Sequence, residues 1–314
     1  LFRTKLTPEN DFSFDGGVII NENLIRNQNT DNHFEIFDYK NNNWNAYTIS
    51  KSNKFYPFNG SFKFPSGSQG IITFNKKFKI IWRTRFANRF QFTDRNILLI
   101  NNQSLIVSSN SRNELLFYFS LLNSPITKLI LEKNLRQENE KDYFIPLKAI
   151  KEFVRIPKIT EDNQFIKDEI IKRTEEMLAL EGETLSDFVD FSKVMLQKFD
   201  MVSVEDDNLV LEKDDKKIKL AIKENKNLIK KVLAEKYNKQ TLKLEKQEIS
   251  LAELKDLPMI DYDKQRKLKD YIDDLVFSLY FRISLQSLGL NKAEEIKSKC
   301  SKNLYYKLVS SQKL

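Results

Sequence analysis

The sequence is poor in the residues that most often build metal and catalytic sites. Among its 314 residues, Cys300 is the only cysteine and His33 the only histidine. A single cysteine excludes an internal disulfide framework and fits a reducing cytoplasm. One histidine and one distant cysteine cannot supply the several nitrogen or sulfur ligands of a zinc site. Most catalytic triads need a histidine that a third group orients, and we see no such group, so His33 is expected in a solvated loop. Cys300 is expected to be a small packed side chain on a helix.

Glycine is scarce, and long apolar runs are absent. The chain has seven glycines and contains neither a GxGxxG pattern nor a P-loop, which excludes the common nucleotide-binding loops. No apolar stretch approaches the length of a membrane span, and no signal-peptide pattern opens the chain. We therefore expect a cytoplasmic protein without a membrane partner. The first residue is Leu rather than Met, which is compatible with a fragment or a trimmed product.

The composition is that of a globular chain with an excess of positive charge. Hydrophobic residues make up 40% of the chain, so a real core can form, and the length suggests roughly two domains. There are 52 Lys and Arg against 44 Asp and Glu, which gives a net charge of +8 and a pI near 9.2. This balance permits a polyanionic partner such as nucleic acid but does not require one.

Two stretches of the chain follow the same pattern. Residues 147–180 read LKAIKEFVRIPKITEDNQFIKDEIIKRTEEMLAL, and residues 251–280 read LAELKDLPMIDYDKQRKLKDYIDDLVFSLY. Each copy predicts a short helix, an apolar step that ends in Pro157 or Pro258, and a polar turn that opens a long amphipathic helix. Such a repeat usually marks one supersecondary unit that is used twice. Two packing elements of an ordinary fold would show the same pattern.

The segment between the two copies predicts smaller elements. Ser186 to Phe199 has the pattern of an amphipathic helix. Val202–Val204, Asn208–Leu211 and Ile218–Ile222 predict a small β-meander. Asn225 to Asn238 predicts a lysine-rich helix, whose lysines we interpret as a solvated face.

Residues 78–93 predict a β-hairpin with one apolar and one polar side. The polar side carries Lys79, Arg83, Arg85, Arg89 and Gln91. Such side chains suit phosphates and base edges, and no acidic residue occurs on this side before Asp94. A solvated sheet face would show the same alternation. Upstream, the chain is rich in Asn, Phe and Tyr and predicts short strands such as Phe34–Tyr39, while Phe55 to Gly70 predicts loops.

An ordered set of motifs carries a family resemblance. A basic and aromatic strand (IIWRTRF) is followed by a helix that ends in LLNSP, then by FIPLKAIKEFVRIPKI and a helix that bears Gln. Residues 75–180 thus resemble the C-terminal specificity region, or target-recognition domain, of bacterial restriction–modification adenine methyltransferases of the TaqI-like and type IIG kind. The stretch LKDYIDDLVFSLYF resembles the closing helix of the same proteins. The proline–Gln unit also resembles the junctions of type I specificity subunits, where recognition modules meet spacer helices.

We therefore expect an α+β fold. A β-rich DNA target-recognition domain is expected at residues 1–145, and a mostly helical scaffold with a small β-meander at residues 146–314. The Asn-Pro-Pro-Tyr-type motif and the glycine-bearing S-adenosylmethionine loop of these enzymes are absent, and no metal-dependent nuclease motif is convincing. The resemblance thus implies that this chain recognises double-stranded DNA and has no catalytic, cofactor-binding or metal-binding residues of its own. S-adenosylmethionine and the chemistry on adenine N6, with or without cleavage, would belong to another part of the polypeptide or to a partner subunit.

The polar side of the hairpin is the predicted DNA contact. Basic side chains on phosphates would give salt-dependent affinity, and arginine or glutamine would read base edges. The catalytic part would flip the target adenine out of the duplex. The main alternative is a non-enzymatic interaction or scaffold module that docks through its long apolar helices, and binding to random duplex across a salt series separates the two. A third hypothesis, a complete enzyme with an unfamiliar site, would need carboxylates that the fold brings together.

Overall fold

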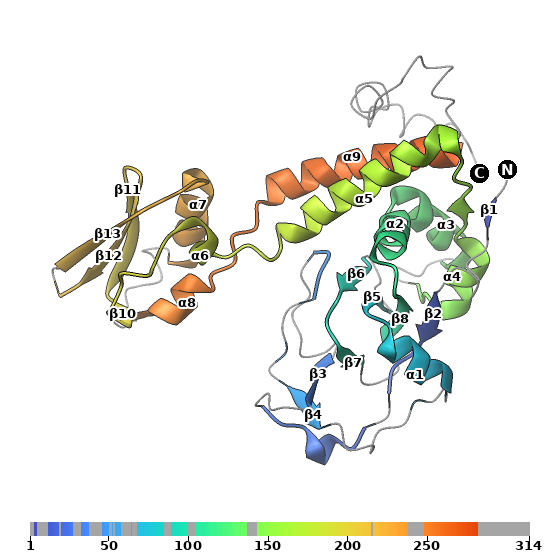
Figure 1. Cartoon of the computed structure of the whole chain (residues 1–314), viewed down its shortest axis with the longest axis horizontal. Helices are drawn as coiled ribbons and strands as arrows, with labels where there is room; N and C mark the ends of the chain where they lie inside the picture. Colours follow the sequence, from blue (N-terminus) through green and yellow to red (C-terminus); the bar gives the residue numbers. More distant parts are fainter. Residues whose placement is uncertain are drawn as a thin grey trace. The chain divides into compact units, whose positions relative to one another are not determined.

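Helices and antiparallel sheets occur together in both units of the chain, which confirms the predicted α+β fold class (Figure 1). The computed structural model describes residues 3–4, 12–18, 20–27, 33–37, 46–49, 52, 54–57, 64, 68–84, 89–99, 104–136, 143–214, 216–237 and 248–281. Unit 1 comprises Leu1–Glu176 and Lys267–Leu314, and unit 2 comprises Met177–Arg266. Unit 2 is therefore an insertion in the sequence of unit 1, and the predicted division between residues 145 and 146 falls inside unit 1.

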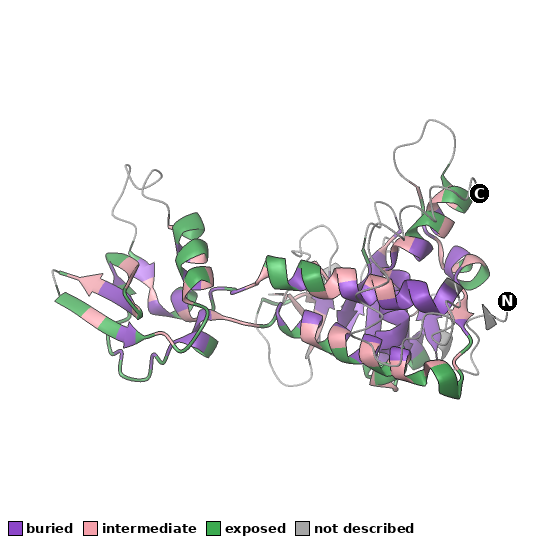
Figure 2. Cartoon of the chain, turned by 90° about the horizontal axis from the view of Figure 1, so that it is seen from above, coloured by how far each residue is buried: buried purple, intermediate pink, exposed green. Residues whose placement is uncertain are grey.

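The centre of unit 1 is a four-stranded antiparallel sheet. Its strands, in spatial order, are β2 (Ser13–Asp15), β8 (Ser104–Ser109), β5 (Phe78–Arg83) and β6 (Gln91–Thr93). β5 and β6 form the predicted hairpin, in which Ile80 pairs with Phe92. A second sheet has the order β4 (Phe55–Pro57), β3 (His33–Phe37) and β7 (Ile97–Leu99). Figure 2 shows that most residues in the strands of unit 1 are buried.

Of the two residues His33 and Cys300, the structure describes only His33. His33 is the first residue of β3, where it pairs with Pro57 of β4, so the predicted loop position is wrong. The apolar residues that follow it, Phe34, Ile36 and Phe37, favour a strand, and the sheet extends back to include the histidine. Cys300 lies outside the described residues.

Helices cover the four-stranded sheet. α2 (Arg112–Leu122) begins at Ser111, whose side chain accepts a hydrogen bond from the Glu114 N–H, and it is buried from Leu115 to Leu122. α3 (Pro125–Leu135) follows at once, because Ser124 caps its first turn and Pro125 tolerates the first helical position. The buried hydroxyls of Ser120 in α2 and Thr174 in α5 (Gln164–Ala179) share a hydrogen bond of 2.6 Å.

Both copies of the sequence repeat adopt the predicted order of elements. In the first copy, α4 (Leu147–Phe153) leads through β9 (Ile156–Pro157) and the short 3-10 helix η3 (Glu161–Asn163) into α5. In the second copy, α8 (Leu251–Lys255) leads through Pro258 into α9 (Tyr262–Phe281). Each proline also joins a short antiparallel pair. Pro157 pairs with Arg3 of β1 (Arg3–Thr4), and Pro258 pairs with Thr184.

Unit 2 contains the predicted meander and the predicted lysine-rich helix. β11 (Met201–Glu205), β12 (Asn208–Lys213) and β13 (Lys216–Ala221) form an antiparallel sheet, followed by α7 (Lys226–Lys236). Near the sheet, β10 (Lys198–Phe199) pairs with β14 (Ile249–Ser250). Apolar side chains from these elements form one core.

The predicted helix over 186–199 is wrong. Only α6 (Leu185–Phe188) forms, and Val189 directly after it has an extended backbone. Val189 makes a β-bridge with Ile222, and the Phe188 carbonyl accepts a hydrogen bond from the Lys223 N–H at 2.9 Å. Tertiary pairing with the end of β13 therefore replaces the bonds that a longer helix would have made.

The two ends of unit 2 are tied together. The Leu185 N–H donates to the Leu257 carbonyl at 3.0 Å, and the Met259 N–H donates to the Glu183 carbonyl at 2.9 Å. In addition, Gln265 in the first turn of α9 donates from Nε2 to Glu181 Oε1 at 2.7 Å in a buried position. These bonds bring the entering and leaving segments side by side, as an insertion between two helices requires.

Candidate nucleic-acid interface

The structure forms the predicted hairpin but covers both of its faces. β5 is buried from Phe78 to Trp82, and only Arg83 at its end is partly exposed. Lys79 has 1% of its surface exposed and Gln91 has 4%. Neither side chain is therefore accessible for the DNA contact that was predicted for it.

The reason is a second layer of packing. One side of the hairpin, with Phe92, meets the helical layer, where the rings of Phe92 and Phe119 of α2 lie 6.1 Å apart. The other side, with Ile81, joins a buried cluster that includes Phe37 and Leu99 of the second sheet. A sheet covered on both sides keeps its two-residue alternation, so the sequence pattern could not reveal that the polar side was also enclosed.

Lys79 has a structural role in this position. Its ammonium donates a hydrogen bond of 2.6 Å to the Lys76 carbonyl, just beyond the end of α1 (Ser68–Asn75), and lies 6.0 Å from the Phe74 ring centroid. A cation is favourable near the carbonyl end of a helix. Burial lowers the pKa of Lys79 to about 8, while the charge of Asp94 acts in the opposite direction.

The lowered pKa predicts a measurable pH dependence for Lys79→Met. Between about pH 8 and 10.4 the unfolded chain binds more protons at this residue than the folded chain, so stability rises with pH there. From pH 7.5 to 9.5, wild type should gain about 2 kcal/mol in free energy of unfolding relative to the variant. Urea denaturation of both proteins at the two pH values measures this. A difference that stays constant with pH would mean that Lys79 keeps its ordinary pKa.

Gln91 is also enclosed. It pairs with Ile81 across the hairpin, and among the described residues its buried Oε1 has no hydrogen-bond partner. Neither Gln91 nor Lys79 has an open path to a duplex in this structure, so neither supports a direct contact.

The predicted arginines lie at the loop end of the hairpin. Arg83 is the last residue of β5 and is paired with Ser104 of β8. Arg89 is exposed, and its guanidinium carbon lies 5.8 Å from the ring centroid of Tyr47. Arg85 lies outside the described residues. Because Ile81 is opposite Gln91, the register places Arg83 and Arg89 at the two ends of the connecting loop.

The base of this loop is firmly held. The Ile145 N–H donates to the Thr84 carbonyl at 2.8 Å, and the Trp82 indole N–H donates to the Ile145 carbonyl at 3.1 Å. Trp82 also packs against Phe90, with ring centroids 5.5 Å apart. The exposed Arg89 therefore projects from a buried, hydrogen-bonded base.

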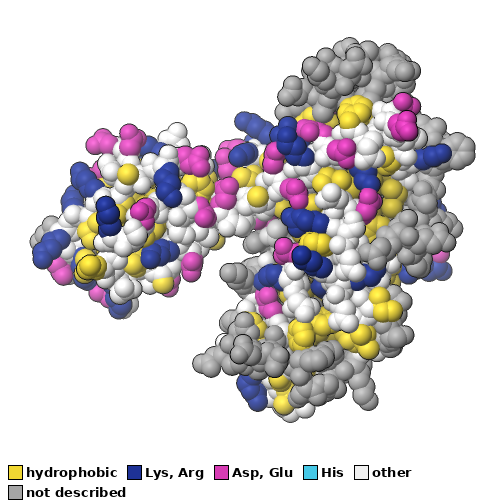
Figure 3. Space-filling model, viewed as in Figure 1, with side chains coloured by type: hydrophobic (Ala, Val, Ile, Leu, Met, Phe, Trp, Pro, Cys, Tyr) yellow, Lys and Arg dark blue, Asp and Glu magenta, His cyan; other side chains and the backbone are white. Residues whose placement is uncertain are grey.

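The excess of positive charge belongs to unit 1. Unit 2 carries 17 Lys and Arg against 19 Asp and Glu, whereas the rest of the chain carries 35 against 25. Figure 3 shows both signs of charge interspersed over the visible face of unit 2. Several meander lysines are paired, for example Lys217 with Glu205 at 3.4 Å and Lys219 with Glu205 at 3.7 Å. A polyanion would therefore be attracted to unit 1 more than to unit 2.

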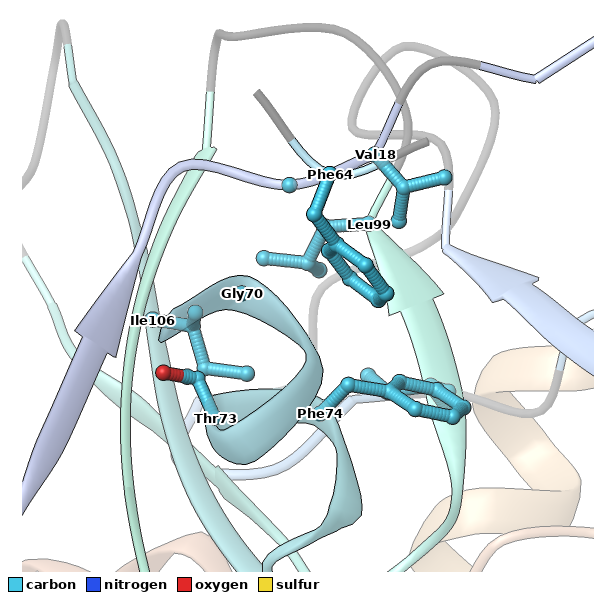
Figure 4. Close-up of a pocket in the computed structure, with 9 residues that line it drawn as sticks. Val18, Phe64, Gly70, Thr73, Phe74, Leu99 and Ile106 are labelled. Atoms are coloured by element: carbon cyan, nitrogen blue, oxygen red, sulfur yellow. The ribbon is translucent and has the colours of Figure 1, made fainter. Parts of the chain in front are cut away.

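The described residues of unit 1 also contain a small pocket between α1, β7 and β8 (Figure 4). Its volume of about 20 Å³ has room for about one water-sized group. Apart from Thr73, its lining consists of glycine and apolar side chains: Gly17, Val18, Phe64, Gly70, Phe74, Ile97, Leu99 and Ile106. This pocket is too small and too apolar to hold a cofactor.

The described residues contain neither a candidate metal site nor a candidate membrane span. Within those ranges, no group of three or more His, Cys, Asp or Glu side chains is placed to hold a metal ion. Nor does any helix there have the length and apolar character needed to cross a membrane.

No protein-family model matches the chain, and no curated protein is significantly similar to it. The family resemblance therefore depends on the ordered motifs alone.

Sequence reasoning missed two residues at the loop end of the hairpin. Tyr47, which lies beneath Arg89, comes from a stretch with no strong pattern. Asn123 lies in the LLNSP motif, and its side chain contacts Phe90. The motif was the only signal that pointed to Asn123, and it gave no role for the residue.

Proposed function

We propose that this chain is the double-stranded DNA recognition portion of a bacterial restriction–modification enzyme, an adenine-N6 methyltransferase whose catalytic domain lies outside this chain. The observation that carries the proposal is Arg89, an exposed arginine at the end of a hairpin whose base is buried and hydrogen-bonded. The order of motifs that resembles target-recognition domains and the excess of positive charge in unit 1 also support it.

Recognition would have two parts. Lys and Arg side chains of unit 1 would contact phosphates, which supplies affinity without sequence preference. Arg89, with Arg83 and Arg85 near it in the sequence, would approach base edges from the loop, and a bidentate arginine contact to guanine is the commonest specific one. A rigid base suits this task, because a loop with fixed ends loses less conformational entropy on binding.

The other parts of the proposed enzyme would supply catalysis and a scaffold. The catalytic domain would bind S-adenosylmethionine and flip the target adenine out of the duplex. The two repeated helical units would form the scaffold that docks the recognition module on that domain. α5 and α9 are amphipathic, with buried residues such as Ile170 and Leu275 on one side and charged residues on the other.

One observation favours the alternative, an interaction module, for unit 2. Met195 has 92% of its surface exposed and Leu196 has 41%, in a unit whose charges nearly balance. Exposed apolar side chains of this kind are more typical of protein contacts than of DNA contacts. Under the proposed function, unit 2 would contact the catalytic or partner polypeptide while unit 1 contacts DNA.

Selection from a pool of randomised duplexes tests the proposal. The full chain should enrich a short, defined sequence, and it should bind that sequence at least ten-fold more tightly than a scrambled duplex. Enrichment of no sequence, together with equal affinity for both duplexes, would contradict sequence-specific recognition and favour the interaction module.

A further inference from the structure

Asn123 connects the LLNSP motif to the hairpin loop. It is the residue that ends α2, where its backbone N–H donates to the Phe119 carbonyl at 3.0 Å. Its side chain contacts Phe90, 33 residues earlier in the sequence. The Phe90 N–H donates to Asn123 Oδ1 at 3.0 Å, and Asn123 Nδ2 donates to the Phe90 carbonyl at 3.1 Å.

This pair of bonds is a substitute for a neighbouring strand. A carboxamide can accept and donate at once, so one asparagine satisfies both backbone groups of Phe90. Nδ2 also donates to the Phe119 carbonyl at 3.1 Å, which ties the carboxamide to the end of the helix. Aspartate could not donate to either carbonyl, and serine is too short to bridge both groups of Phe90. The arrangement therefore requires the chemistry of asparagine at this position.

Both ends of the loop are thus attached to residues outside the hairpin. At the start of the loop, the Thr84 carbonyl is held by the Ile145 N–H. At its end, Phe90 is held by Asn123, and the Phe92 N–H two residues later donates to the Tyr47 carbonyl at 2.8 Å. Arg89 directly precedes Phe90 and lies over the Tyr47 ring.

We propose that Asn123 is a positioning residue that sets the direction of Arg89 for sequence-specific contact with duplex DNA. The inference rests on the proposed function and adds a residue that does not itself touch DNA. It also gives the Asn of LLNSP a physical role, because the helix end, the hairpin loop and the exposed arginine are joined through one carboxamide.

Binding by Asn123→Ala tests the positioning role. The probes are the duplex selected by wild type and a scrambled duplex of the same composition. The ratio of the two affinities should fall about ten-fold or more in the variant, because phosphate contacts persist while the base contact is misdirected. Asn134→Ala is the matched control: Asn134 Nδ2 also donates to the carbonyl four residues earlier, that of Ile130, but in an exposed part of α3. It should keep the wild-type ratio.

A wild-type ratio in folded Asn123→Ala, or an equal loss of affinity for both duplexes, would overturn the positioning role. If the alanine variant does not fold, Asn123→Asp takes its place. The aspartate keeps an acceptor for the Phe90 N–H but cannot donate to the Phe90 carbonyl, so its ratio should also fall.

Hydrogen exchange separates this inference from the proposed function, because it needs no DNA. The Phe90 amide should exchange up to about ten-fold faster in Asn123→Ala than in wild type, since the Phe90 N–H loses its hydrogen-bond acceptor. In Asn123→Asp it should keep its protection, and in Asn134→Ala it should not change. If wild type selects no duplex, the proposed function fails, and with it the DNA-directed part of the inference. Unchanged exchange at Phe90 would show that Asn123 does not fix the loop.

Discussion

Trp82→Ala is expected to lower the free energy of unfolding of unit 1 by about 3–5 kcal/mol. Trp82 is fully buried, its indole N–H donates to the Ile145 carbonyl, and its ring packs against Phe90. The substitution would leave a large cavity and would also remove the donor from a backbone carbonyl. No compensating collapse is expected, because the residue lies in a sheet that is covered on both sides.

Hydrogen exchange of the β5 amides measures this loss within unit 1, which is preferable because a chain with two units need not unfold in one step. Phe144→Ala is the matched control, since Phe144 is an aromatic residue with 49% of its surface exposed, next to the Ile145 that Trp82 contacts. It should change stability by less than about 1 kcal/mol. Equal losses for the two variants would mean that Trp82 does not anchor the hairpin.

The double variant Arg83→Ala/Arg89→Ala is expected to weaken binding of the selected duplex by about 2–6 kcal/mol, or about 30-fold or more in Kd. The expectation assigns about 1–3 kcal/mol to each base contact. Both residues flank the hairpin loop; Arg89 is exposed, and Arg83 at the end of β5 is partly exposed.

An electrophoretic mobility shift titration at fixed salt gives this change in Kd. Lys230→Ala/Lys231→Ala in α7 of unit 2 removes the same number of positive charges from exposed positions and should leave Kd within about two-fold of wild type. A loss confined to the lysine variant would move the DNA-binding surface to unit 2. Unchanged affinity of the arginine variant would exclude the loop end of the hairpin.

The elements with a clear period could be predicted from the sequence. The two proline-broken helical units were predicted because both a helix-period stripe and a proline position recur in 147–180 and 251–280. The β-meander was predicted from three short apolar segments separated by turn residues. In these places local propensity and burial point to the same structure.

The features that the sequence did not predict depend on tertiary contacts. Alternation in 78–93 correctly gave the hairpin, but it could not show that a second sheet encloses Lys79 and Gln91. Phe55 to Gly70 was predicted as loops, but β4 occupies Phe55–Pro57 and α1 begins at Ser68. At the site, the bond between Asn123 and Phe90 joins residues that are far apart in the sequence, so no local pattern could reveal it.

The division of the chain into two units could not be predicted from the sequence either. The chain leaves unit 1 after Glu176 and returns at Lys267, inside two helices that look continuous in their periodicity. The two ends of unit 2 are brought together by pairing of segments that are far apart in the sequence, such as Leu185 with Leu257. The spacing of hydrophobic residues locates a helix, but it does not show which hydrophobic core each turn of that helix packs against.

The salt dependence of duplex binding by the full chain tests the central claim most directly. Unit 1 should bind a duplex with log Kobs falling linearly against log salt, by a slope of about −0.9 for each phosphate contact. Neutralising Lys216, Lys217 and Lys219 of unit 2 with glutamine should leave that slope unchanged. A flat salt response of wild type, or a slope that disappears with the three lysines, would contradict DNA recognition by unit 1.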